Sequence, residues 1–151
     1  MNMRILAAMA GAALAAVAGW YILSALAPQP PGQDGADGAG TAAPGAPIVA
    51  VSLPETLSEQ ARIGKRAFEA KCAECHGANA AGREGTAPPL VHRYYEPGHH
   101  GDAAFMRAAQ AGVRAHHWPF GDMPPVEGVT KTDIDKIVIY VRELQRANGI
   151  H

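Results

Sequence analysis

Neither sign of charge dominates this sequence, and long runs of one sign are missing. The 151 residues include 13 Lys and Arg and 14 Asp and Glu, which gives a formal net charge of −1. No basic run favours a nucleic-acid partner, and there is no acidic tail. The sequence also lacks an alternating strand pattern and an internal repeat. We therefore expect no nucleic-acid function and an all-α fold.

Cysteine is scarce as well, since the only two are Cys72 and Cys75 in KCAECHG, residues 71–77. A structural zinc site needs four ligands, but the chain has no second cysteine pair. His116 and His117 are adjacent and do not have the spacing of a zinc-binding histidine pair. A thioredoxin-like dithiol follows a strand, whereas this pair comes at the end of a predicted helix. Both sites are disfavoured.

The run C-x-x-C-H is typical of covalent attachment of a c-type haem. Cys72 and Cys75 would each form a thioether with one haem vinyl group, and a ring nitrogen of His76 would bind the iron. Two covalent links can hold a large apolar cofactor in a domain too small to enclose it by packing alone. The motif therefore predicts one haem c with its iron.

The first 27 residues predict a membrane anchor. After Arg4 the stretch from Ile5 to Ala27 is uncharged and mostly apolar, and it exceeds the about 20 residues that a helix needs to cross a bilayer. Trp20 and Tyr21 lie near its far end, where interfacial aromatic residues are common. Arg4 favours a cytoplasmic N-terminus. We expect one transmembrane helix in a bacterial inner membrane, with the rest of the chain in the periplasm.

A cleaved signal peptide is the alternative for this segment. Ala25-Leu26-Ala27 has the small-x-small pattern of a cleavage site. The apolar stretch is longer than that of a typical signal peptide, and Pro28 would directly follow the cut. The anchor is therefore the preferred interpretation, and both alternatives export the remaining chain.

Residues 28–54 are rich in Pro, Gly and Ala and predict a flexible linker between the anchor and a haem domain over residues 55–151. Within that domain, Thr56 and Glu59 suggest a capping box that opens a helix running to the cysteines. A second helix is expected over residues 102–113. A third should begin after Thr130 or Thr132 and end at Gly149, because apolar residues recur there with helical periodicity, at Ile134, Ile137, Val138, Val141 and Leu144.

With these elements, residues 57–148 resemble a class I cytochrome c. Gly64 and Phe68 precede Cys72 at four-residue steps, as in the first helix of that family, and Ile137 and Tyr140 match its last helix. The resemblance implies three to five helices around one covalently bound haem. It also implies that Gly64 allows the last helix to cross closely and that Phe68 packs against it.

The same resemblance suggests the remaining site residues. TAPPL, residues 86–90, matches the loop in which the Pro88 carbonyl accepts the His76 Nδ1 proton and Leu90 packs on the haem. FGDMPPV matches the Met-Pro loop of bacterial members, which makes Met123 the expected sixth iron ligand. His116 or His117 remains the alternative ligand. The other methionine of the domain, Met106, is expected to fill the core.

The domain is also unusually rich in histidine outside the haem motif. Solvated loop residues or partners of haem propionates are the first interpretation, and Trp118 is either a propionate donor or a core aromatic. Copper binding, or docking of a copper protein, is the alternative, because imidazole binds copper well. The histidines concerned are His92, His99, His100, His116 and His117.

The predicted function is single-electron transfer without bond chemistry, because two protein ligands would leave the iron closed to a substrate. The expected partners are membrane redox proteins such as a quinol–cytochrome c reductase, a terminal oxidase or another reductase, and no small-molecule substrate is expected. Two alternatives stay open. The chain could be a fixed haem subunit of a larger membrane oxidoreductase, or a five-coordinate sensor or peroxidase.

Overall fold

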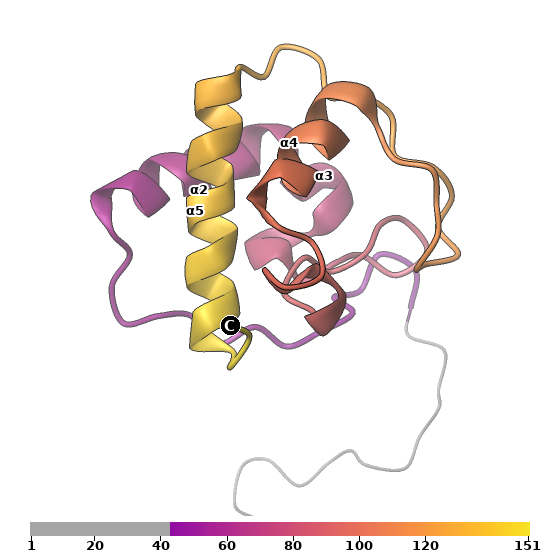
Figure 1. Ribbon diagram of the computed structural model, residues 1–151. Coiled ribbons are helices and arrows are strands. Elements are labelled where there is room, and N and C mark those ends of the chain that lie inside the picture. Colours follow the sequence, from indigo (N-terminus) through magenta and orange to yellow (C-terminus); the bar gives the residue numbers. More distant parts are fainter. Residues whose placement is uncertain (1–42) are drawn as a thin grey trace, which may run out of the picture. The chain divides into compact units, whose positions relative to one another are not determined.

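A computed structural model describes residues 43–151 of the chain. This part is helical, with two single 3-10 turns and two isolated β-bridges but no strand within the range 43–151. The all-α prediction is thus confirmed for the described residues. The elements in chain order are α2 (Glu59–Lys71), α3 (Ala73–His76), η1 (Ala78–Ala80), η2 (Arg93–Tyr95), α4 (Asp102–Ala111) and α5 (Lys131–Ala147) (Figure 1).

The predicted anchor, residues 1–27, and the first part of the predicted linker lie outside the described residues. None of the helices between residues 43 and 151 is both long and apolar enough to span a bilayer.

The end of the predicted linker differs from expectation, because residues 43–54 are part of the folded domain. Ile48 and Val49 both donate backbone hydrogen bonds to the Ala81 carbonyl, each 3.1 Å long. Ser52 and Asn148 exchange two more, in which the Ser52 N–H donates to Asn148 Oδ1 (2.9 Å) and Asn148 Nδ2 donates to the Ser52 carbonyl (2.8 Å). The domain boundary at residue 55 was therefore placed too late. This segment is rich in Pro and Ala, and it is held in place by residues that are far from it in the sequence.

Helices α2 and α5 cross closely and form the centre of the domain (Figure 1). A Cβ at Gly64 would lie 1.9 Å from the Lys136 carbonyl oxygen, so only glycine fits at the crossing. Phe68 and Tyr140 pack with ring centroids 5.7 Å apart, and both are almost fully buried. Ile137 belongs to the same core. The predicted close crossing and its aromatic contact are confirmed.

Both ends of α5 agree with the sequence, whereas α4 ends at Ala111, two residues before the expected end at residue 113, because Gly112 has a φ of 77°. Thr130 caps α5 in a reciprocal capping box with Asp133, and Gly149 adopts a positive φ of 74° just beyond its end. The predicted capping box of Thr56 and Glu59 is wrong. Ser58 caps α2 instead, and its hydroxyl accepts the Ala61 N–H at 3.1 Å. Ser and Thr are both good N-caps, so the T-x-x-E spacing alone placed the start of α2 two residues too early.

Tyr140 gives the domain a specific sensitivity to alkaline pH. Its hydroxyl donates to Asn79 Oδ1 (3.2 Å), and burial, reinforced by the Glu69 carboxylate, raises the pKa of this phenol to about 12. The folded state therefore holds the proton more tightly than the unfolded state, whose tyrosine pKa is about 10. The contribution of this group to the free energy of unfolding is fully present below pH ~10 and is lost as the pH rises toward 12.

We expect Tyr140→Phe to flatten this alkaline loss of stability. The measurement is the urea midpoint between pH 9 and 12, for which Tyr94→Phe, at an exposed ring, is the control. An unchanged pH slope in Tyr140→Phe would contradict the assignment.

Candidate functional site

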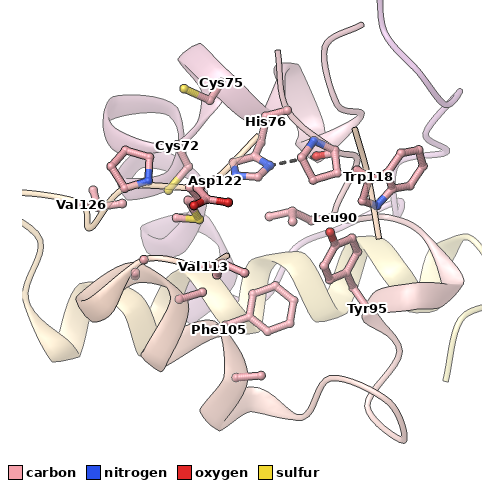
Figure 2. A pocket seen from close by; sticks show the side chains of 18 of the residues that line it. Cys72, Cys75, His76, Leu90, Tyr95, Phe105, Val113, Trp118, Asp122 and Val126 are labelled. Atoms are coloured by element: carbon pink, nitrogen blue, oxygen red, sulfur yellow. Dashed lines mark hydrogen bonds between the residues drawn. The ribbon is translucent and has the colours of Figure 1, made fainter. Parts of the chain in front are cut away.

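One cavity of about 570 Å³ collects the residues that the sequence singled out. Its size falls within the about 300–1,000 Å³ that is usual for cofactor sites. The lining is mainly apolar and comes from the haem motif, the loop before η2, α4, the loop before α5 and α5 itself (Figure 2). All six predicted site residues line it: Cys72, Cys75, His76, Pro88, Leu90 and Met123.

Cys72 lies between α2 and α3, and Cys75 and His76 belong to the single turn of α3. The Cys72 N–H donates to the Phe68 carbonyl (2.7 Å), and the Cys72 carbonyl accepts the N–H groups of Cys75 (3.1 Å) and His76 (2.9 Å). Cys72 is half-buried, while Cys75 is exposed. The i, i+3, i+4 spacing of the motif is therefore one helical turn, which presents all three side chains to the same cavity.

The chemistry of this turn does not fit a redox dithiol. Burial raises the pKa of the Cys72 thiol to about 11, with the nearby Cys75 as a smaller cause. Nucleophilic cysteines of redox motifs need the opposite shift, toward a stable thiolate. Nor do the cysteines belong to a metal-binding group: over residues 43–151, the one cluster of three suitable side chains is His99, His100 and His117.

His76 is held in the orientation that an iron ligand requires. The side chain is 8% exposed, and its Nδ1 lies 2.9 Å from the Pro88 carbonyl oxygen (Figure 2). The carbonyl can only accept, so Nδ1 carries the proton and Nε2 keeps a free lone pair. Burial lowers the pKa of His76 despite this hydrogen bond, which favours the neutral ring that binds metals. The hydrogen bond implied by the resemblance is therefore present.

The loop that presents Pro88 is closed by backbone contacts. The Gly82 N–H donates to the His76 carbonyl (2.7 Å), and Arg83 donates to the Ala87 carbonyl (2.9 Å). Gly77 has a φ of 74°, and a Cβ there would lie 2.4 Å from the Gly82 carbonyl oxygen. A residue other than glycine after the haem histidine would therefore both strain the backbone and open this loop.

The structure separates the two methionines of the described residues. Met123 lines the cavity, and its backbone exchanges two hydrogen bonds of 2.9 Å with Val113. These bonds close the loop between residues 113 and 123 at its base. Met106 is half-buried and lines a separate hollow together with Lys131 and Asp135, outside the core cluster, so the prediction that it fills the core is wrong. Of these two methionines, only Met123 can thus contact a group bound in the cavity.

The alternative histidine ligands are also at the cavity. His116 and His117 belong to its lining, on the loop closed by Val113 and Met123. His116 Nδ1 lies 2.8 Å from the Arg114 carbonyl oxygen, and His117 Nε2 lies 3.3 Å from His99 Nε2. Each of them therefore already makes a contact at the rim, whereas the Met123 thioether makes no polar contact in the described structure.

An unpaired donor shows that the cavity suits a haem. Trp118 Nε1 is buried and has no hydrogen-bond partner among the described residues, although the indole lines the cavity. Burial raises the pKa of the neighbouring Tyr95 phenol to about 12, and the Trp118 N–H near it acts in the opposite direction, although no hydrogen bond of normal geometry joins the two groups. A buried N–H in this mainly apolar lining is suited to a carboxylate, and a haem carries two as propionates. The residues present therefore fit this group.

Two residues that support the site without lining the cavity were missed in the sequence. Arg142 is 7% exposed, and its guanidinium donates to Asp102 Oδ1 (2.8 Å) and to the carbonyls of Tyr95 and His100 (each 2.6 Å). Gln145, fully buried, donates to the carbonyls of Leu90 and Tyr95. Together they fix the loop before α4 on α5. Arg142 and Gln145 each follow an apolar residue, Val138 and Val141, by four positions. This spacing places them on the apolar face of the helix, and it was the one sign in the sequence that they are buried.

We expect Arg142→Met to cost about 3 kcal/mol of unfolding free energy, because it leaves the His100 carbonyl and the buried Gln145 Oε1 without their donor. Asp102 is 71% exposed and contributes little of this. Arg142→Lys should recover only part of the loss, since an ammonium cannot reproduce the planar fork. Urea denaturation measures the effect, and Arg146→Met, at an exposed position of α5, is the control. Equal losses in both variants would contradict this role.

The cavity and the haem motif together define a protein that carries covalently attached haem. A comparison with protein-family models matches residues 61–145 to the family Cytochrome c, which is more than half of the chain. The chain therefore belongs to this family, as a class I c-type cytochrome. It binds haem c with its iron and is an electron-transfer haem protein. A search of curated proteins finds no match to it.

Proposed function

We propose that this chain is a membrane-anchored, mono-haem electron carrier with its haem domain in the periplasm. The observation that supports it most is that His76 and Met123 line one cavity, so that the chain itself can supply both axial ligands of one haem. When bound, the haem iron supplies a reversible one-electron couple. With both axial positions filled by side chains, no position is left for a substrate.

Each side chain at the cavity has its own role in this proposed function. Cys72 and Cys75 attach the haem through thioethers. His76 binds the iron through Nε2, and the Pro88 carbonyl fixes its ring and raises its basicity. Leu90 lines the cavity beside Pro88 and helps to exclude water. Met123 would hold the iron from the other side of the cavity lining through its thioether, a soft ligand that would favour the reduced iron and so raise the potential.

The anchor and the partners are proposed from the sequence. The apolar stretch before residue 28 supports attachment to the inner membrane, and c-type haem is attached on its periplasmic side. A domain without a strong charge bias suits redox partners that are held close in the same membrane, because weak electrostatic steering matters less there. The proposed partners are a quinol–cytochrome c reductase as donor and a terminal oxidase or other reductase as acceptor.

Carbon monoxide tests the carrier function, because it binds ferrous haem only at an open axial position. We expect the reduced protein at neutral pH to leave its visible spectrum unchanged under carbon monoxide. Prompt binding would overturn the proposal in favour of a gas or peroxide site.

Purification from detergent-solubilised membranes then decides whether the chain is a separate, mobile carrier or a fixed subunit of a complex. Stoichiometric co-elution with one complex would overturn the mobile carrier.

A further inference from the structure

Three imidazoles meet at the rim of the haem cavity, two of them from its lining, and the proposed electron-transfer function gives this group no role. One ring nitrogen of each lies within 4.8 Å of the other two. We define this histidine cluster as His99, His100 and His117, and we propose that it binds one late first-row transition-metal ion, copper(II) in preference to the others.

The spacing within the cluster fits a metal ion. Nε2 of His99 and Nε2 of His117 are 3.3 Å apart. Two neighbouring nitrogens bound to one metal at about 2.0 Å are separated by about 2.8 Å in a square-planar site and by about 3.3 Å in a tetrahedral one. The observed pair is therefore close enough to share one ion. A hydrogen bond between His99 and His117 would account for this pair alone and would not explain why a nitrogen of His100 also lies within 4.8 Å of both.

The loop backbone prepares His100 as a ligand. Its Nδ1 lies 2.6 Å from the Tyr94 carbonyl oxygen and so carries the proton, which leaves Nε2 free for a metal. Such a hydrogen bond to the second ring nitrogen is the usual companion of a metal-bound histidine. The His100 carbonyl in turn accepts from Arg142, so that the ring extends from a fixed backbone.

The chemistry of the cluster selects the metal. It contains imidazoles and no carboxylate, which disfavours magnesium and calcium. Imidazole suits copper, zinc and nickel, and among these copper(II) binds most tightly. His99 is exposed, which gives an ion access from solvent.

Copper(II) titration of the purified, haem-loaded full-length chain tests the site. We expect one copper(II) per chain, with nitrogen hyperfine structure from several imidazoles in its electron paramagnetic resonance spectrum. The double variant His99→Asn, His117→Asn should weaken binding by at least about 100-fold, the scale on which metal sites respond even to lost supporting partners. His151→Asn, a histidine at the exposed C-terminal end, is the matched control and should bind like the native chain.

Equal copper affinity in the native chain and the double variant, or the absence of nitrogen hyperfine structure, would overturn the proposal. The visible spectrum of the same double variant separates this failure from a failure of the proposed haem ligation. An unchanged oxidised haem spectrum with lost copper binding supports the site. A changed haem spectrum would instead make His117 an iron ligand, which overturns both the metal site and the role of Met123.

Discussion

Replacing Gly64 with alanine is expected to destabilise the haem domain by about 3 kcal/mol, at the upper end of overpacking costs. The new Cβ would lie 1.9 Å from the Lys136 carbonyl oxygen and 2.4 Å from its carbon. Both atoms belong to the α5 backbone, so no side-chain rotation relieves the contact, and the two central helices must move apart. The Phe68–Tyr140 contact at the same crossing would weaken with them.

Thermal and urea unfolding of the haem-loaded domain measure this effect. For a domain of this size we expect the melting temperature to fall by roughly 10–20 °C. Gly98→Ala is the matched control, because nothing lies within 4 Å of its added methyl group and its φ is not in the left-handed region. That control should stay within about 0.5 kcal/mol of the native protein. Native stability in Gly64→Ala would show that α2 and α5 do not cross as described.

Met123→Ala is expected to change the haem more than any other substitution outside the C-x-x-C-H motif. Loss of the thioether should abolish the weak near-infrared sulfur-to-iron band of the oxidised protein. The reduction potential should fall by on the order of 0.1–0.2 V, a modest part of the ≈ 0.8 V range that axial ligands set. The vacated position should also let the reduced protein bind carbon monoxide.

Met106→Ala is the control for this experiment, since Met106 lies outside the haem cavity. It should retain the near-infrared band and the potential. If Met123→Ala instead keeps the native spectrum, and His116→Ala or His117→Ala changes it, the sixth ligand is a histidine. The potential of the native protein would then be low rather than high.

The parts of this molecule that were predictable follow from local spacing. The C-x-x-C-H run fixes three side chains on one helical turn, and the apolar period after Thr130 gives α5 with its cap. Gly64 and Pro88 came from the resemblance, and their contacts with α5 and His76 are present. In each case the informative residues lie within one element or one matched motif.

The parts that were missed depend on contacts between distant segments. Residues 43–54 have the composition of a linker, and their order comes from Ala81 and Asn148. The meeting of His99 with His117 joins two loops on either side of α4, and the spacing of histidines along the chain does not reveal it. The role of Arg142 was missed for a related reason, because its partners, the Asp102 carboxylate and the carbonyls of Tyr95 and His100, lie about 40 or more positions away in the sequence.

The paired hydrogen bonds between Val113 and Met123 also set how quickly the proposed iron ligand can rebind after it dissociates. Because the loop is closed at its base, the Met123 side chain would stay tethered within reach of the cavity even when it did not hold the iron. Its effective concentration near the iron is then that of a short tether, in the millimolar range or above. A small external ligand at micromolar concentration would compete poorly against such recapture. Selectivity against poisons of open haems would thus come from two backbone hydrogen bonds as much as from the strength of the iron–sulfur bond.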